Sequence, residues 1–523
     1  MTRPRTHAGM ATVLGVLLCS VLYGDDFPAR VVRQLAELRA GVTPAAWLAA
    51  HPADRFARFA RDLVREQDER WCARASFTDT VATGARFVRY AYFYPPPPPP
   101  SLGLPSGDAA TLVREQCVLG TIWVEAAVPD SAAGSILAVQ VREALTRAYG
   151  PVRAAPDAFF GRVPTDSQRK LMARLPNADA MLLGVHFFGA GAWRVPGRWQ
   201  VDSTVAVSAL DVGFGAPRRV PGQERVLAFA FLPVAELGSF GWVARREEAV
   251  ERKAAALAAE AARLSGINRR QVDRLLGMLG AAESGYSGRA PAPMRPPRPA
   301  ALDSAAVAAL RDWIASARTL DAPHRAAALL AADQVLGSRA LIYVRAQRED
   351  SATRMALQRL GAAFVYDELG GGYNYAHTWL DEALRLDPHG RAGTLATLAL
   401  LRSGFNETGM CGGGADAFRR VIETGEQFLA GAVDSATSGE VHLLVGDAYA
   451  DIVALASGAG LEYADSAAYT AEVPAARRKA VTHYRQGLAL DPMSPEARAA
   501  WLEAWRLLAD LPPTTTHFFC VYD

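Results

Sequence analysis

The chain has 523 residues, of which 50% are hydrophobic and 21% are charged, and its formal net charge is +2. One hydrophobic core seldom grows beyond roughly 250–300 residues, so we expect two or three domains. The near-zero net charge argues against a general affinity for nucleic acid or for an anionic membrane surface.

Residues 1–24 have the pattern of an export signal. An uncharged run from Met10 to Tyr23 follows two arginines. At about 14 residues the run is shorter than the roughly 20 that a membrane-spanning helix needs, and it suits the apolar region of a signal peptide. We therefore expect a protein of the bacterial periplasm or cell envelope. A lipid anchor on Cys19 and an uncleaved, membrane-associated N-terminus are the alternatives.

Four cysteines lie beyond the signal segment, and an even number in an oxidising compartment permits disulfides. The pairings that join segments close in the chain or within one domain are Cys72 with Cys117 and Cys411 with Cys520. The alternative is four buried free thiols.

Residues 25–94 are predicted to form an N-terminal helical segment. Val31 and Leu35 have helical spacing, and so do Phe56, Phe59 and Leu63 in the sequence that follows. Six consecutive prolines, Pro95–Pro100, then favour a polyproline II rod. We interpret residues 95–116 as a stiff spacer rather than a ligand for an aromatic groove.

Residues 117–283 predict an α+β domain with a mixed or antiparallel sheet, followed by trailing helices. Three features carry this prediction: a strand after Cys117, a helix that ends at Gly150, and two late strands read as an antiparallel hairpin. The charged residues at 243–279 suggest a solvated helix face. Residues 284–302 are rich in proline and glycine, and we place the main domain boundary in this linker.

Residues 303–523 are predicted to be almost entirely helical. A set of large and small residues there follows the spacing large-x-x-Leu-Gly-x-x-aromatic, then Ala-x-x-x-large-x-x-Ala-x-x-x-x-Pro. The residues are Leu357, Leu360, Gly361, Phe364, Ala376, Leu380, Ala383 and Pro388. This pattern resembles the first and second helices of a tetratricopeptide repeat. The resemblance implies close helix packing at Gly361 and a helix stop at the Asp-Pro pair.

A second set of residues repeats the resemblance further along the chain. Gly446 and Tyr449 match a first helix, and a second helix is matched by Ala480, Tyr484, Gly487 and Pro492. The resemblance covers roughly 350–510. The regular 34-residue unit is not kept, because insertions at 370–372 and 457–474 lengthen both hairpins. We expect a closing helix near the C-terminus with a polar outer face.

Taken together, these patterns predict a mainly helical α+β multidomain chain whose α+β domain precedes an α-solenoid of helical hairpins. Arrays of this kind bind a peptide or a partner protein. The resemblance makes five residues candidates for such a binding groove: Tyr373, Asn374, His377, Tyr449 and His483.

The sequence contains no zinc, nucleotide or nucleophile-elbow motif, so we expect no metal, no cofactor and no catalytic residue. The favoured function is a non-catalytic interaction or scaffold protein of the cell envelope. One alternative is an exported hydrolase-like enzyme with a site in 117–243 near His186, Arg198 and Asp202. The other is a structural subunit of a membrane complex or a soluble solute-binding partner of a transporter.

Overall fold

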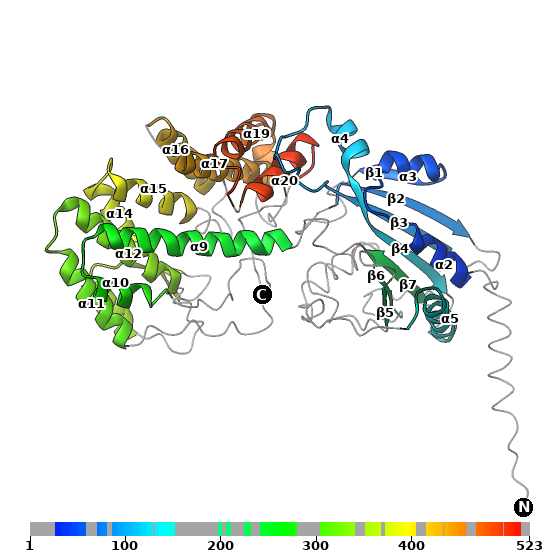
Figure 1. Ribbon diagram of the computed structural model, residues 1–523, viewed down its shortest axis with the longest axis horizontal. Helices are drawn as coiled ribbons and strands as arrows, with labels where there is room; N and C mark the ends of the chain where they lie inside the picture. Colours follow the sequence, from blue (N-terminus) through cyan, green and yellow to red (C-terminus); the bar gives the residue numbers. More distant parts are fainter. Residues whose placement is uncertain are drawn as a thin grey trace, which may run out of the picture.

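The computed structural model shows a mainly helical chain with an antiparallel sheet, an α+β fold (Figure 1). The structure describes residues 27–58, 71–80, 86–128, 131–151, 197–200, 206–210, 224–231, 241–279, 304–339, 351–367, 372–403, 415–431, 434–456, 467–494 and 496–513. The predicted signal segment, Cys19, the linker at 284–302, Cys411 and Cys520 lie outside these residues.

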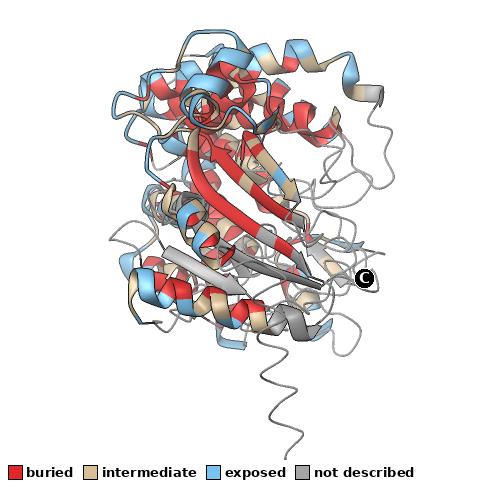
Figure 2. Ribbon diagram, turned by 90° about the vertical axis from the view of Figure 1, so that its right-hand side faces the viewer, coloured by how far each residue is buried: buried red, intermediate tan, exposed pale blue. Residues whose placement is uncertain are grey.

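Seven strands form one antiparallel sheet in the order β1-β2-β3-β4-β7-β6-β5. Their bounds are β1 Arg55–Arg58, β2 Ala73–Thr80, β3 Arg86–Tyr94, β4 Val118–Val128, β5 Gly197–Gln200, β6 Ala206–Leu210 and β7 Glu224–Phe231. The central pair β3–β4 places Tyr90 opposite Trp123. Figure 2 shows long buried strands at the centre of this sheet. The predicted antiparallel pairing of the two late strands is confirmed by β6 and β7.

The prediction of a helical segment at 25–94 is wrong for most of the residues that the structure describes there. Among those residues, the helices are α2 (Phe27–Ala36) and α3 (Pro44–Ala50), whereas β1, β2 and β3 belong to the sheet. A short apolar pattern fits both the period of a helix and the two-residue period of a strand. Pairing with β2 therefore decides the conformation around Phe56. The sheet domain therefore begins well before residue 117.

The predicted spacer at 95–116 is also corrected. These residues connect β3 to β4, two neighbouring strands of one sheet, and they include the helix α4 (Ala109–Gln116). Asp108 caps α4 by accepting hydrogen bonds from the backbone amides of Ala110 and Thr111. The next helix, α5 (Ser131–Tyr149), ends before Gly150 as predicted and contacts β4, β5, β6 and β7.

The rest of the described chain is helical apart from one small hairpin, β8 (Phe364–Asp367) with β9 (Gly372–Tyr375). The helices are α9 Gly241–Leu264, α10 Arg269–Leu276, α11 Ser304–Ala317, α12 Ala322–Arg339, α13 Ser351–Arg359, α14 Thr378–Leu386, α15 Arg391–Ser403, α16 Asp416–Leu429, α17 Ser435–Ala456, α18 Ala467–Thr470, α19 Val473–Leu490 and α20 Ala497–Leu508.

Seven of these helices form two rows. In the first row α12 contacts α15, α15 contacts α17, and α17 contacts α20. In the second row α14, α16 and α19 each contact the two first-row helices that flank them. Both α14 and α19 end directly before the predicted Asp-Pro pairs, with Asp387 and Asp491 as their C-caps.

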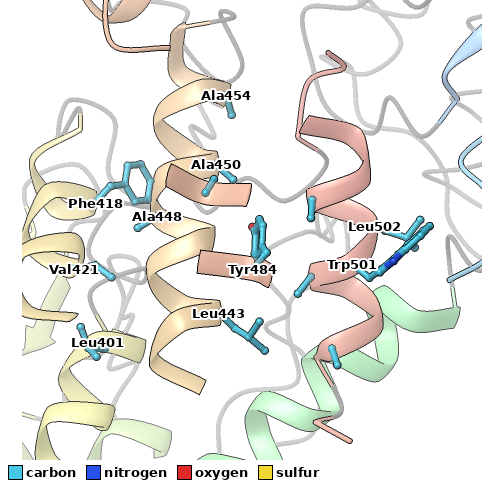
Figure 3. Close-up of a cluster of buried hydrophobic side chains, with 14 of the residues drawn as sticks. Leu401, Phe418, Val421, Leu443, Ala448, Ala450, Ala454, Tyr484, Trp501 and Leu502 are labelled. Atoms are coloured by element: carbon cyan, nitrogen blue, oxygen red, sulfur yellow. The ribbon is translucent and has the colours of Figure 1, made fainter. Parts of the chain in front are cut away.

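The helices α17 and α19 pack closely because glycines lie where they cross. A Cβ atom at Gly446 would lie 2.8 Å from the ring of Tyr484, and one at Gly487 would lie 2.6 Å from a methyl carbon of Leu443. Figure 3 shows Tyr484 beside α17, near Leu443 and Ala450. The hydroxyl of Tyr484 donates to Asp447 at 2.7 Å, which satisfies this buried polar group.

The first set of repeat-like residues is arranged differently from the prediction. Helix α13 ends at Arg359, Gly361 has a φ of 104° beyond that end, and Phe364 lies in β8. Ala376 precedes α14 rather than packing within it. Gly361 thus serves the left-handed turn that ends a helix, not a helix crossing. Leu380 and Ala383 are buried on α14, which contacts α12.

The helical part begins at α9, not at residue 303. Figure 1 shows α9 as one long helix that passes along the rows, and it contacts α12, α15 and α20. Ala258 and Ala262 on α9 are fully buried, so this helix has a buried face as well as exposed positions. Lys253 forms ion pairs with Glu440 of α17 at 3.5 Å and with Glu496 before α20 at 2.8 Å. The domain boundary predicted at 284–302 therefore falls inside the helical part.

The closing helix α20 joins the helical part to the sheet domain. Trp501 donates from its indole to the carbonyl of Gly103 at 3.0 Å, and Trp505 donates to the side chain of Gln116 at 2.9 Å. Glu503 and Arg506 are buried, so these two charged residues do not form the polar outer face that was predicted for this helix. The sheet domain thus covers the end of the two rows of helices at α20.

Candidate functional site

The five binding residues predicted from the sequence fall into two separate groups. Tyr373 and Asn374 lie on β9, and His377 precedes α14. Tyr449 lies on α17 and His483 on α19. The two groups differ in exposure and in chemistry, and we describe them in turn.

The hairpin β8–β9 carries four aromatic rings on one face, which we call the aromatic ladder: Phe364, Tyr366, Tyr373 and Tyr375. Cross-strand pairing places Phe364 against Tyr375, with ring centres 5.8 Å apart, and Tyr366 against Tyr373, with ring centres 5.1 Å apart. Tyr375 is 7% exposed, whereas Tyr366 is 52% exposed. The two-residue period of a strand puts the four rings on one face, and their exposures show that the ladder runs from the core to the surface.

Helix α13 adds a cation beside the ladder. The guanidinium of Arg354 lies 3.9 Å from the ring centre of Tyr373, a cation–π contact. The neighbouring Met355 is 44% exposed, and Val365 on the other face of β8 is 62% exposed. The hairpin thus has exposed side chains on both of its faces, and Arg354 lies against the face that carries the tyrosines.

His377 anchors the base of the hairpin to α12. Its backbone is left-handed, with a φ of 50°, and its Nδ1 lies 3.1 Å from the buried carboxylate of Asp333. A Cβ at Gly337 would lie 3.0 Å from the imidazole, so the glycine makes room for the ring. Burial, followed by the nearby Asp333 carboxylate, raises the pKa of the Tyr375 hydroxyl above its ordinary value. The contacts of His377 with Asp333 and Gly337 thus hold the base of the hairpin against α12.

The second group is a polar cluster between α16, α17 and α19, which we call the His–Glu–Lys cluster: Glu426, His442, Tyr449, Lys479 and His483. The Nδ1 atoms of His442 and His483 lie 2.9 Å apart and share a hydrogen bond. Tyr449 donates to Glu426 at 2.7 Å, and Lys479 donates to Glu426 at 3.1 Å and to Tyr449 at 2.7 Å. These bonds join three helices.

The electrostatics of the His–Glu–Lys cluster favour neutral imidazoles and charged flanking groups. Burial, followed by the adjacent His442, lowers the pKa of His483 to about 4, and burial also lowers the pKa of His442. The hydrogen bond with Tyr449 raises the pKa of Lys479. Burial opposes ionisation of Glu426, but the bonds from Tyr449 and Lys479 lower its pKa overall. Each polar or charged side chain of the cluster thus has a hydrogen-bond partner within it.

A cavity of about 40 Å³ lies where α9, α15, α17 and α20 meet. Five of its lining side chains are charged: Lys253, Arg402, Glu440, Asp447 and Glu496. Its volume suits one or two water molecules, not an organic substrate of the size that pockets normally hold. The cavity therefore belongs to an ion-pair network that holds helices together.

The catalytic alternative places its residues largely outside what the structure describes. Arg198 lies on β5, whereas His186 and Asp202 are outside the described residues. Among the described residues, no three His, Cys, Asp or Glu side chains gather so as to hold a metal ion. Within the same ranges, no helix has the length and apolar character needed to cross a bilayer.

The structure adds residues to both groups that the sequence analysis did not select. They are Asp333, Arg354, Met355, Val365, Tyr366, Glu426, His442 and Lys479. One signal for the ladder was present: the alternating sequence Phe364–Asp367, a run of glycines and Gly372–Tyr375 together indicate a hairpin. No comparable signal exists for Glu426 and Lys479, because 53 positions separate them.

We compared the chain with protein-family models, with curated protein sequences and with solved structures, and none of the three comparisons gave a match. The functional argument is therefore made from the geometry of the two groups.

Proposed function

We propose that this is a non-catalytic partner-binding protein of the bacterial cell envelope, in which the two helical rows form an α-solenoid resembling tetratricopeptide arrays. The alternation of the first-row helices with α14, α16 and α19 supports this architecture. The observation that carries the binding function is the exposed aromatic ladder. Its outer ring, Tyr366, is 52% exposed; Val365, on the opposite face of β8, is 62% exposed, and Met355, next to Arg354 on α13, is 44% exposed.

The face of the first row is an unsuitable site for a partner because α9 of the same chain lies along it. Besides the contacts of Lys253, Arg391 at the start of α15 pairs with Glu260 of α9 at 2.7 Å. Burial of alanines on α9 makes this packing part of the core. The groove expected from the resemblance is thus occupied by α9, and among the described residues we place the binding surface on the hairpin.

The chemistry of the ladder suits an extended segment of a partner protein. Within the described residues, β8 and β9 pair only with each other, so their outer edges retain backbone groups for a further strand. An added strand gains main-chain hydrogen bonds, and alternate side chains of the segment contact the tyrosines. Tyrosine, methionine and arginine are enriched in the buried centres of protein interfaces.

The test is affinity purification of the full chain from its own host after cross-linking, with the double variant Met355→Ala/Tyr366→Ala beside the wild type. Met493→Ala is the matched control, since Met493 is 88% exposed and lies before α20, away from the hairpin. We expect the wild type and the control to retain a common partner that the double variant loses.

Two further measurements make the outcome decisive. Circular dichroism must show the same helical content in all three proteins. Hydrogen exchange must show slower exchange of the amides of β8 when the purified partner is bound. Capture of the same partner by the double variant, or unchanged exchange in β8, contradicts the proposed surface.

A further inference from the structure

One hydrogen bond at the base of the hairpin β8–β9 shows which of its backbone groups point outward. The amide of Ala376 donates to the carbonyl of Ala363 at 2.9 Å, and the next pair in the register is Phe364 with Tyr375. In antiparallel strands, hydrogen-bonded pairs alternate with pairs whose amides and carbonyls point away from each other. Ala363 and Ala376 form a bonded pair, so the backbone groups of Phe364 and Tyr375 point to the outer edges of the hairpin.

The outer edge of β8 therefore offers the backbone groups of two residues. By the same alternation, Val365 bonds to β9, and Tyr366 points its amide and carbonyl outward as Phe364 does. Within the part of the chain that the structure describes, no hydrogen bond to another segment uses the backbone of Phe364 or Tyr366. An added strand would find two donors and two acceptors, in sets about 6.8 Å apart, which is twice the rise per strand residue.

The edge of β8 is accessible, whereas the corresponding edge of β9 faces the rest of the molecule. Val365 and Tyr366 are both exposed on β8. On β9, Tyr375 is buried, and the guanidinium of Arg354 from α13 lies over the ring of Tyr373. A further strand is therefore expected beside β8.

The chain around the start of β8 is basic. The stretch 351–366 contains Arg354 and Arg359 and no acidic residue. Arg359, in the last turn of α13, is exposed. Arg318, directly after α11, is also exposed, and its guanidinium donates to the carbonyl of Leu360 at 3.4 Å. Among the described residues, no carboxylate pairs with Arg318 or Arg359. Two cations without a carboxylate partner favour a binding segment that carries negative charge.

We propose that the hairpin binds an acidic, extended segment of a partner protein, which pairs with the outer edge of β8 through the backbone of Phe364 and Tyr366. We rest this on the proposed function of the aromatic ladder and add to it the edge, the register and the charge of the bound segment. Alternate side chains of the segment contact the ring of Tyr366 on one face and Val365 on the other. An aspartate or glutamate near the start of β8 approaches Arg318 and Arg359, where a lysine would meet like charge.

The first experiment replaces one backbone amide by an ester in the full chain. Incorporation of the α-hydroxy analogue of tyrosine at Tyr366 or at Tyr373 removes one outward N–H group and keeps the ring, so the two proteins are matched. The probe is a short peptide of alternating valine and glutamate with blocked ends, and its Kd is measured by calorimetric titration. We expect the ester at Tyr366 to weaken binding by about tenfold, as for the loss of one hydrogen bond. The ester at Tyr373 should leave Kd unchanged. Equal effects at both positions, or none at either, overturn pairing with β8.

The second experiment tests the charge with a peptide of alternating valine and lysine. We expect the wild type to bind the acidic peptide at least about tenfold more tightly than the basic one. The double variant Arg318→Gln/Arg359→Gln should lose most of this preference. Arg485→Gln/Arg498→Gln is the matched control, because both arginines are exposed on α19 and α20 and the change in net charge is the same. Equal binding of the two peptides, or an equal loss in both variants, overturns the acidic segment.

Hydrogen exchange in the free chain separates a wrong register from a wrong partner surface. We expect the amide of Val365 to exchange at least about tenfold more slowly than that of Tyr366, because only the former is bonded within the hairpin. Equal exchange of the two amides overturns the register and leaves the proposed ladder surface to its own purification test. Loss of the common partner from the wild type in that test would instead remove the proposed function and this segment with it.

Discussion

Tyr373 of the aromatic ladder and Tyr449 and His483 of the His–Glu–Lys cluster were selected from the sequence for the same reason, yet the structure gives the two groups opposite properties. In the cluster, each of the five polar side chains has a hydrogen-bond partner within the group. On the ladder, Tyr366 and its apolar neighbours are exposed. A satisfied polar network holds helices together, whereas exposed aromatic surface is available to a partner. Polar and aromatic residues that lie close together therefore do not by themselves show whether a group is a structural network or a binding surface.

The largest expected effect is a loss of stability where the helices α17 and α19, which carry most of the cluster, pack against each other. Gly446→Leu places a side chain where the ring of Tyr484 already lies, at 2.8 Å from the first added carbon. We expect the free energy of unfolding to fall by about 3 kcal/mol, the upper end of the usual overpacking cost. Urea unfolding measures this change. Leu490→Ala, an exposed position on α19, should change stability far less; a matching loss there would contradict the packing argument.

The second effect concerns the ladder. Tyr366→Ala should weaken binding of a purified partner by about 2 kcal/mol, or roughly thirtyfold in Kd, if Tyr366 is at the centre of the interface. Because the ring is 52% exposed, the free energy of unfolding should change by no more than about 0.5 kcal/mol. Calorimetric titration and urea unfolding give the two values. An effect on stability larger than that on binding would make the ladder a structural feature like the cluster.

The third effect is a pH dependence confined to the cluster. The pKa values of His483, about 4, and of His442 are lowered on folding. The unfolded chain therefore binds protons more tightly. The stability that the neutral pair contributes is complete above the unfolded pKa of about 6.5 and is lost as the pH falls toward 4.

We expect this loss to be about 1 kcal/mol after allowance for solvent screening. It is measured as the difference in unfolding free energy between pH 7 and pH 4.5. The double variant His442→Gln/His483→Gln should show a smaller difference. An identical pH dependence in the wild type and the variant would remove the imidazole pair as its cause.

The smallest effect is expected at the exposed edge of the cluster. Lys479 bridges Glu426 and Tyr449, but its side chain is 54% exposed. Lys479→Met keeps most of the side-chain volume and should lower the free energy of unfolding by no more than about 0.5 kcal/mol, as for other surface ion pairs. It should leave partner binding unchanged. A change of more than tenfold in Kd would instead place the partner on the cluster, and the proposed ladder surface would then be wrong.

Local signals in the sequence anticipated several elements of the fold. The strand β4, the helix that ends before Gly150 and the Asp-Pro ends of α14 and α19 depend on neighbours within one or two turns, and β6 pairs with the next strand along the chain. The same reasoning failed at Phe56 and Phe364, where four-residue strands were read as helix. Short apolar patterns fit both periods, so pairing with a distant or later strand decided the result.

By itself, the sequence determined where glycine permits two helices to meet, as at Gly446 and Gly487, and where aspartate and proline end them. These properties belong to single residues and to their backbone freedom. Only the tertiary structure decided which surfaces are free. It filled the face of the first row with α9, it covered α20 with the sheet domain, and it buried Cys72 and Cys117 as free thiols. The reason is physical: burial and pairing depend on contacts between segments far apart in the chain, and no local pattern records them.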